Sequence, residues 1–146
     1  MGRKWLLAGI AFLAVVFAAP PASAQGVDIY ASRNYVTTGD YVDFYVSVDD
    51  RGWEDYPVDV YIVEIDPLGR ASYLDFNYWA LLDGIYPSLV YWPMFGFPQS
   101  PLISMPITRD MYAGTYWWYF VLVPYAADPF VFDNWYFWDA AYFDVY

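Results

Sequence analysis

The chain has 146 residues and a formal net charge of −11, with 17 acidic residues against six basic ones and neither histidine nor cysteine. The lack of cysteine excludes a disulfide framework and thiol chemistry. The lack of histidine removes imidazole catalysis and the commonest zinc ligand. Because so acidic a chain repels polyanions, we expect no nucleic-acid partner.

The first 24 residues have the features of an export signal. Arg3 and Lys4 precede an apolar run from Trp5 to Ala19, and Ala22-Ser23-Ala24 is typical of a cleavage site. We expect one mature domain over residues 25–146, exported to the extracellular space, the cell surface or the periplasm, without a membrane span. Its four arginines against 17 acids leave a net charge of −13.

The mature chain reads as short extended runs separated by turns. The first run is Val27 to Ser32, and a Thr37-Thr38-Gly39-Asp40 turn leads into a second from Tyr41 to Asp49. In the second run apolar residues alternate with polar ones or tyrosine, which is typical of a strand with one buried and one wet face. We expect its inner face to be Val42, Phe44, Val46 and Val48.

A charged turn, Asp49 to Tyr56, separates this strand from a third over Val58 to Ile65. Here Glu64 has the same parity as the apolar Val58, Val60 and Ile62, and this pattern indicates either a β-bulge or burial on both faces. After an Asp-Pro-Leu-Gly turn, residues 70–76 form a shorter expected strand. The next segment, about 77–106, contains five prolines among aromatic residues, and we expect a long insert with edge pieces near 88–91 and 102–105.

Residues 115–123, TYWWYFVLV, predict a strand that is apolar on both faces. Tyr116, Trp118, Phe120 and Leu122 are expected in the core, so that Trp117, Tyr119 and Val121 form an outer apolar stripe. Two possibilities remain open for this stripe: the Pro-aromatic insert folds over it, or another molecule does. An aromatic loop over 125–138 and a final strand over 139–146 complete the chain.

Three segments together resemble secreted bacterial immunoglobulin-like β-sandwich domains: YVTTGDYVDFYVSV, PVDVYIVEIDPLGR and RDMYAGTYWWYFVLVPYAADP. The resemblance implies an all-β, two-sheet antiparallel Greek-key sandwich of about seven strands, here with the long Pro/aromatic insert. It implies no catalytic residues, and the aromatic density of this chain exceeds what such domains need.

One cluster of acids is a candidate calcium site. Asp49, Asp50, Glu54 and Asp55 lie on one turn, and hard cations prefer several convergent carboxylates. Their spacing matches no calcium-loop template, and solvated turns of an acidic protein look the same. A weaker candidate is Asp128, Asp133 and Asn134. We expect no other cofactor.

The function that these patterns favour is a non-enzymatic extracellular structural or interaction module, whose partner is a second copy of the chain in a non-covalent assembly or filament, or another extracellular protein. Aromatic residues are enriched at the centres of such interfaces. The alternative is a carbohydrate-binding module that stacks sugars on exposed Trp and Tyr, with a polysaccharide as partner. The expected interaction surface comprises Trp117, Tyr119, Val121, Trp92, Phe95, Phe97, Trp135 and Trp138.

Overall fold

The computed structural model describes residues 26–146, and these residues form an all-β protein of two sheets. The expected signal sequence lies outside the described residues. The elements are β1 (Val27–Ala31), β2 (Tyr35–Val36), β3 (Tyr41–Val48), β4 (Pro57–Ile65), β5 (Ala71–Asp75), β6 (Ala80–Asp83), β7 (Leu89–Pro93), β8 (Phe97–Pro106), β9 (Gly114–Pro124), the 3-10 turn η1 (Phe132–Asn134) and β10 (Phe137–Val145).

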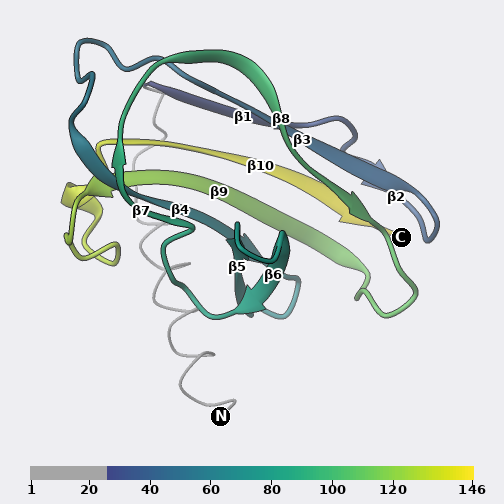
Figure 1. Ribbon diagram of the computed structural model, residues 1–146. Helices are drawn as coiled ribbons and strands as arrows, with labels where there is room; N and C mark the ends of the chain where they lie inside the picture. Colours follow the sequence, from purple (N-terminus) through teal and green to yellow (C-terminus); the bar gives the residue numbers. More distant parts are fainter. Residues whose placement is uncertain (1–25) are drawn as a thin grey trace.

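The two sheets pack as layers of a sandwich (Figure 1). The small sheet has the order β1-β3-β8, and the large sheet has the order β2-β10-β9-β4-β5-β6, with β7 also paired to β4. The pairing of β2 with β10 is parallel, whereas the other pairings between described strands are antiparallel. Short turns join most strands, but one segment leaves the large sheet at β7, arches over and enters the small sheet as β8 (Figure 1).

The core lies between the layers, and the alternation in β3 places it as predicted. Val42, Phe44, Val46 and Val48 are buried, while the residues between them are more exposed. The inward face of β9 meets them, and the ring of Trp118 stacks on that of Phe44 with centroids 4.3 Å apart. The assignment of one β9 face to the core is therefore confirmed.

The outer face of β9 is covered by the chain itself. Tyr119 and Val121 are buried together with Tyr61 and Val63 of β4 in a second apolar cluster. The segment between β9 and β10 packs on this cluster, chiefly through Trp135, which is also buried. Burial on both faces, one of the two readings of the muddled parity in β4, is thus what the structure shows, with one core on each side of the large sheet.

The segment expected to be a loop insert contains three strands. β8 pairs with β3 over most of its length in spite of Pro98, Pro101 and Pro106. Proline lacks the N–H that a central strand donates, but β8 is an edge strand, and its register with β3 shifts twice. The prolines are tolerated because only one side of β8 is paired.

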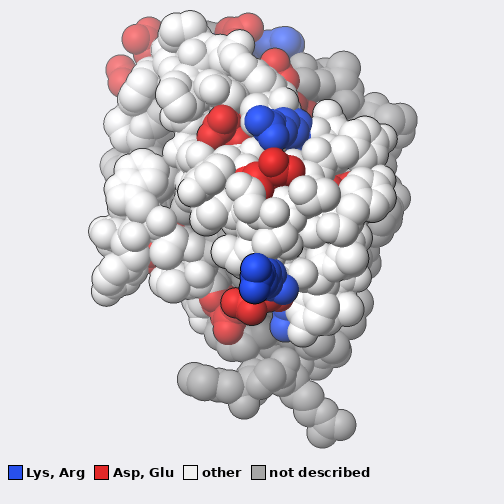
Figure 2. Space-filling model, turned by 90° about the vertical axis from the view of Figure 1, so that its right-hand side faces the viewer, with Lys and Arg blue, Asp and Glu red and all other residues white. Residues whose placement is uncertain are grey.

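Three of the four arginines in residues 26–146 pair with acids. Arg33 pairs with Asp40, Arg51 with Asp49 and Arg70 with Asp66. Figure 2 shows a face that is largely neutral, on which blue groups adjoin red ones. In residues 26–146, no helix is both long and apolar enough to cross a membrane.

Candidate functional site

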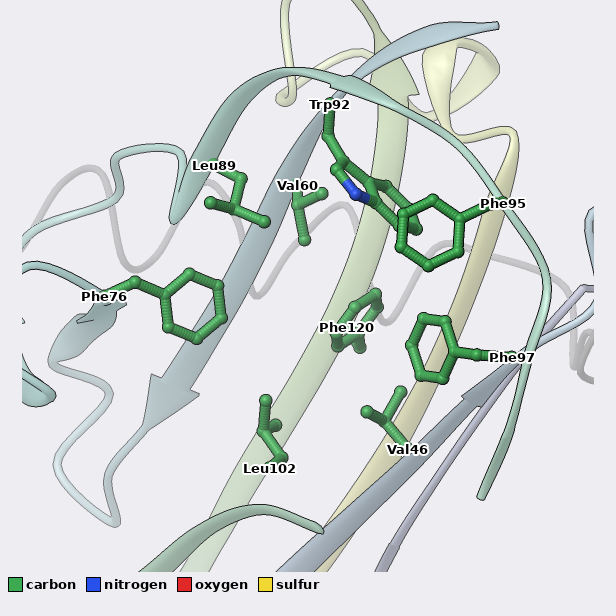
Figure 3. Close-up of a pocket in the computed structure, with 9 residues that line it drawn as sticks. All are labelled: Val46, Val60, Phe76, Leu89, Trp92, Phe95, Phe97, Leu102 and Phe120. Atoms are coloured by element: carbon green, nitrogen blue, oxygen red, sulfur yellow. The ribbon is translucent and has the colours of Figure 1, made fainter. Parts of the chain in front are cut away.

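A cavity of about 220 Å³ lies between the two sheets, beneath the segment that joins β7 to β8. We call residues 89–97 the strap. Figure 3 shows side chains from both sheets and from the strap pointing toward the same space. The nine lining residues are all apolar: Val46, Val60, Phe76, Leu89, Trp92, Phe95, Phe97, Leu102 and Phe120.

The cavity has a buried floor and an exposed rim. Val46, Val60 and Phe120 come from the central strands β3, β4 and β9, and each is at most 5% exposed. The rim residues Leu89 and Phe95 belong to the strap and are 37% and 49% exposed. A ligand therefore has an apolar interior to enter and an apolar edge to cross, and none of the nine lining residues carries an ionisable group.

Main-chain hydrogen bonds hold the strap over the cavity at its middle and at its far end. Met94, fully buried, donates from its N to the Tyr56 carbonyl (3.1 Å) and accepts from the Asp55 amide (2.8 Å). Gly96 donates from its N to Asp50 Oδ2 at 3.1 Å. The turn from 49 to 56 is thus the support on which the strap rests.

A buried carboxylate fixes the strap at its near end. Asp59 on β4 accepts from the amide of Tyr91 in the strap (3.0 Å) and from that of Ala126 after β9 (2.9 Å). Tyr91 and Ala126 both have left-handed backbones, with φ of 54° and 63°, which residues other than glycine seldom adopt. The rings of Tyr91 and the adjacent Tyr125 meet edge to face with centroids 4.8 Å apart. The two hydrogen bonds to Asp59 explain how the unfavourable backbone conformations of Tyr91 and Ala126 persist.

The expected interaction surface is divided among three environments. Tyr119, Val121 and Trp135 are buried, and Trp117 and Trp138 are half-buried against the same outer cluster. These five offer no continuous free face, because the loop before β10 covers it. Trp92, Phe95 and Phe97 instead line the cavity. Sequence patterns had indicated these three rings, but for a surface rather than for an interior site.

Three of the acids proposed for calcium, Asp49, Asp50 and Asp128, accept hydrogen bonds from main-chain amides. Asp49 accepts from the Arg51 amide and pairs with its side chain, and Asp50 accepts from the Gly52 and Gly96 amides. In the weaker candidate, Asp128 accepts from the Phe130 amide. Within residues 26–146 no three carboxylates gather as a metal site requires.

A second buried carboxyl group lies in the core between the sheets. Glu64 of β4 accepts a hydrogen bond from Trp118 Nε1 at 2.8 Å. Burial raises the pKa of Glu64 from 4.5 to about 7, the Trp118 hydrogen bond opposes this rise, and the charge of Asp66 adds to it. In the sequence, Glu64 has the parity of Val58, Val60 and Ile62, and this shared parity is the signal that could have found it.

Comparisons with known proteins identify no family for this chain. No family model matches it, and no curated protein does. Among solved structures, the chain is similar to Pseudomonas fluorescens alkylpurine DNA glycosylase AlkC bound to DNA containing an abasic site analog, with a TM-score of 0.45 and 11% identity. The match covers 99% of this chain and 36% of that one, so this chain spans about a third of the glycosylase.

This finding corrects three expectations from the sequence. The matched protein is an enzyme bound to DNA. It contradicts the expected non-enzymatic structural or carbohydrate-binding module, and with it the expectation that the protein is no enzyme. It also contradicts the expected partners, which were a second copy, another extracellular protein or a polysaccharide, and excluded nucleic acid. The physical reasons differ. The stripe meant for self-assembly is covered by its own chain, and net charge describes an average field rather than a local site. At a TM-score of 0.45, the likeness transfers neither glycosylase activity nor DNA binding to this chain.

Proposed function

We propose that this protein binds a small apolar molecule, or the apolar end of a larger one, in the cavity beneath the strap. The observation that carries the proposal is the lining: nine apolar side chains from both sheets surround about 220 Å³, and the rim is open at Leu89 and Phe95. Ligand pockets are mostly apolar and largely formed in advance, as this one is.

The size of the cavity limits the ligand. It exceeds the roughly 150 Å³ of an apolar cavity that stays dry and takes up benzene. It is smaller than the roughly 300 Å³ at which pockets for drug-sized molecules begin. One aromatic ring or a short alkyl chain is therefore the part that enters, and any remaining part of the ligand extends past the rim.

The cost of an empty cavity supports the same conclusion. At about 24 cal/mol per Å³, a void of 220 Å³ in a closed core would cost about 5 kcal/mol, an upper bound because this cavity opens at the rim. Water gains little in a space lined only by carbon, since it needs polar partners. An apolar guest restores the missing contacts, and its affinity comes from that gain.

Two expectations from the sequence, which concern the fold family and export of the protein, are kept as proposals. The first is an immunoglobulin-like Greek-key sandwich, supported by the packing of two sheets with the strand orders described above. Tyr116, whose OH donates to the Tyr112 carbonyl at 3.1 Å, supports it too, because such domains carry a tyrosine corner at this place. The second is export, supported by the features of residues 1–24; the proposed binding needs no resident cofactor.

Titration calorimetry with the straight-chain alcohols from butanol to decanol tests the binding. We expect affinity to rise about fourfold per added methylene, which corresponds to about 0.8 kcal/mol, until the cavity is full and the gain stops. Leu89→Trp, at the rim, should remove this binding, whereas Leu68→Trp, an equally large change at an exposed turn residue, should leave it intact. Affinities that do not depend on chain length, or equal effects of both substitutions, would overturn the proposal.

A further inference from the structure

The support of the strap is acidic. Carboxylates of Asp50 and Asp59 lie within hydrogen-bond distance of strap amides, at 3.1 and 3.0 Å, and the Asp55 amide is bonded to the strap at Met94. A head group beside Phe95, which directly precedes Gly96, is thus close to the Asp50 carboxylate and to the other charges of the turn 49–56. The Debye length is about 8 Å at physiological ionic strength, so they act on it with little screening.

The arginines are distributed unevenly along the sandwich. The strap end contains the turn 49–56, Asp59 and the loop 125–136, which together hold seven acids and one arginine, a net charge of −6. That arginine, Arg51, is paired with Asp49. The other three arginines of the described chain, Arg33, Arg70 and Arg109, lie in the turns at the far ends of β1, β4 and β8. Of these three, Arg33 and Arg70 pair with acids.

We propose that the cavity selects amphiphiles with a cationic head group, namely ammonium compounds that carry a short alkyl chain or one aromatic ring. The inference rests on the proposed function, because the apolar part must first occupy the cavity. The head group then lies at the rim, between exposed Phe95 and the acidic turn, where a cation is attracted and a carboxylate is repelled. The exposed ring adds a cation–π surface of its own.

Three probes with the same six-carbon chain test the selection: hexylammonium, 1-hexanol and hexanoate. At low ionic strength we expect hexylammonium to bind on the order of tenfold more tightly than hexanoate, with 1-hexanol between them. At about 1 M salt, where the Debye length falls to about 3 Å, the three affinities should converge. Equal affinities at low salt, or tightest binding of hexanoate, would overturn the inference while 1-hexanol still supports the cavity.

A matched pair of variants locates the charge responsible. Asp55→Asn removes one charge beside the strap, and the left-handed φ of 62° at this position suits asparagine. Asp110→Asn makes the same change in the loop after β8, at the far end of the sandwich. We expect Asp55→Asn to reduce the preference for hexylammonium over hexanoate about two- to threefold and Asp110→Asn to change it little. Equal effects of the two variants would refute a local origin, and failure of all three probes would refute the proposed function itself.

Discussion

Replacing Glu64 by glutamine removes a group whose protonation is coupled to folding. Burial in the core raises its pKa from 4.5 to about 7, so the folded protein holds this proton more tightly than the unfolded chain does. The stability from Glu64 is therefore fully present below about pH 4.5 and is lost as the pH rises through about 7. The gap between 4.5 and about 7, at about 1.36 kcal/mol per pKa unit, amounts to about 3 kcal/mol.

Urea denaturation of the wild type and of Glu64→Gln, across the range from about pH 4.5 to about pH 9, measures this term. The wild type should lose about 3 kcal/mol of unfolding free energy relative to the variant over this range. Glutamine keeps the side-chain shape and an oxygen that accepts from Trp118 Nε1, so any constant cost of its amide cancels when the slopes are compared. Asp139, whose pKa burial also raises, titrates in both proteins. Parallel pH profiles of the two proteins would refute the reasoning.

Two further pairs of substitutions test a hydrogen-bonded carboxylate at the strap and a close contact in the fold. Asp59→Ala should lower the unfolding free energy by about 2–5 kcal/mol, because two main-chain amides lose their acceptor, whereas Asp59→Asn keeps one acceptor and should cost clearly less in the same urea assay. Gly26→Ala should cost more than Gly52→Ala: both positions have left-handed φ (78° and 86°), but only at Gly26 would a Cβ lie 2.5 Å from a ring carbon of Phe137. Equal midpoints for the two alanine variants would contradict this account of Gly26.

Much of the fold follows from local patterns. The alternation in residues 41–48 determines which face of β3 is buried, and the double parity of residues 115–123 and 58–65 indicates strands covered on both sides. In the proline-rich segment, the expected edge pieces near 88–91 and 102–105 correspond to β7 and β8, but the strands are longer than expected because the rule against proline in sheets applies to central strands. Whether β8 is an edge strand depends on the order β1-β3-β8, a non-local property that no short window contains.

The cavity is harder to predict than the strands. Its nine lining residues come from five strands (β3, β4, β7, β8 and β9), the link between β7 and β8 and the turn after β5, and each is an ordinary apolar residue when considered alone. Trp92, Phe95 and Phe97 stand out in the sequence, yet only the path of the strap from one sheet to the other turns them inward (Figure 3). The role of Asp59 is equally hard to predict, because it depends on two amides that are 32 and 67 residues away in the sequence.

The most direct test of the account is a methyl NMR titration with 1-hexanol, using the wild-type protein labelled at valine and leucine. If the ligand enters the cavity, the shifted methyl groups should be those that line it: Val46, Val60, Leu89 and Leu102. Exposed Leu68 and Val131, which lie outside the lining, should stay unchanged. Shifts spread over exposed methyl groups, or no saturable shift at the four lining residues, would contradict a ligand site beneath the strap.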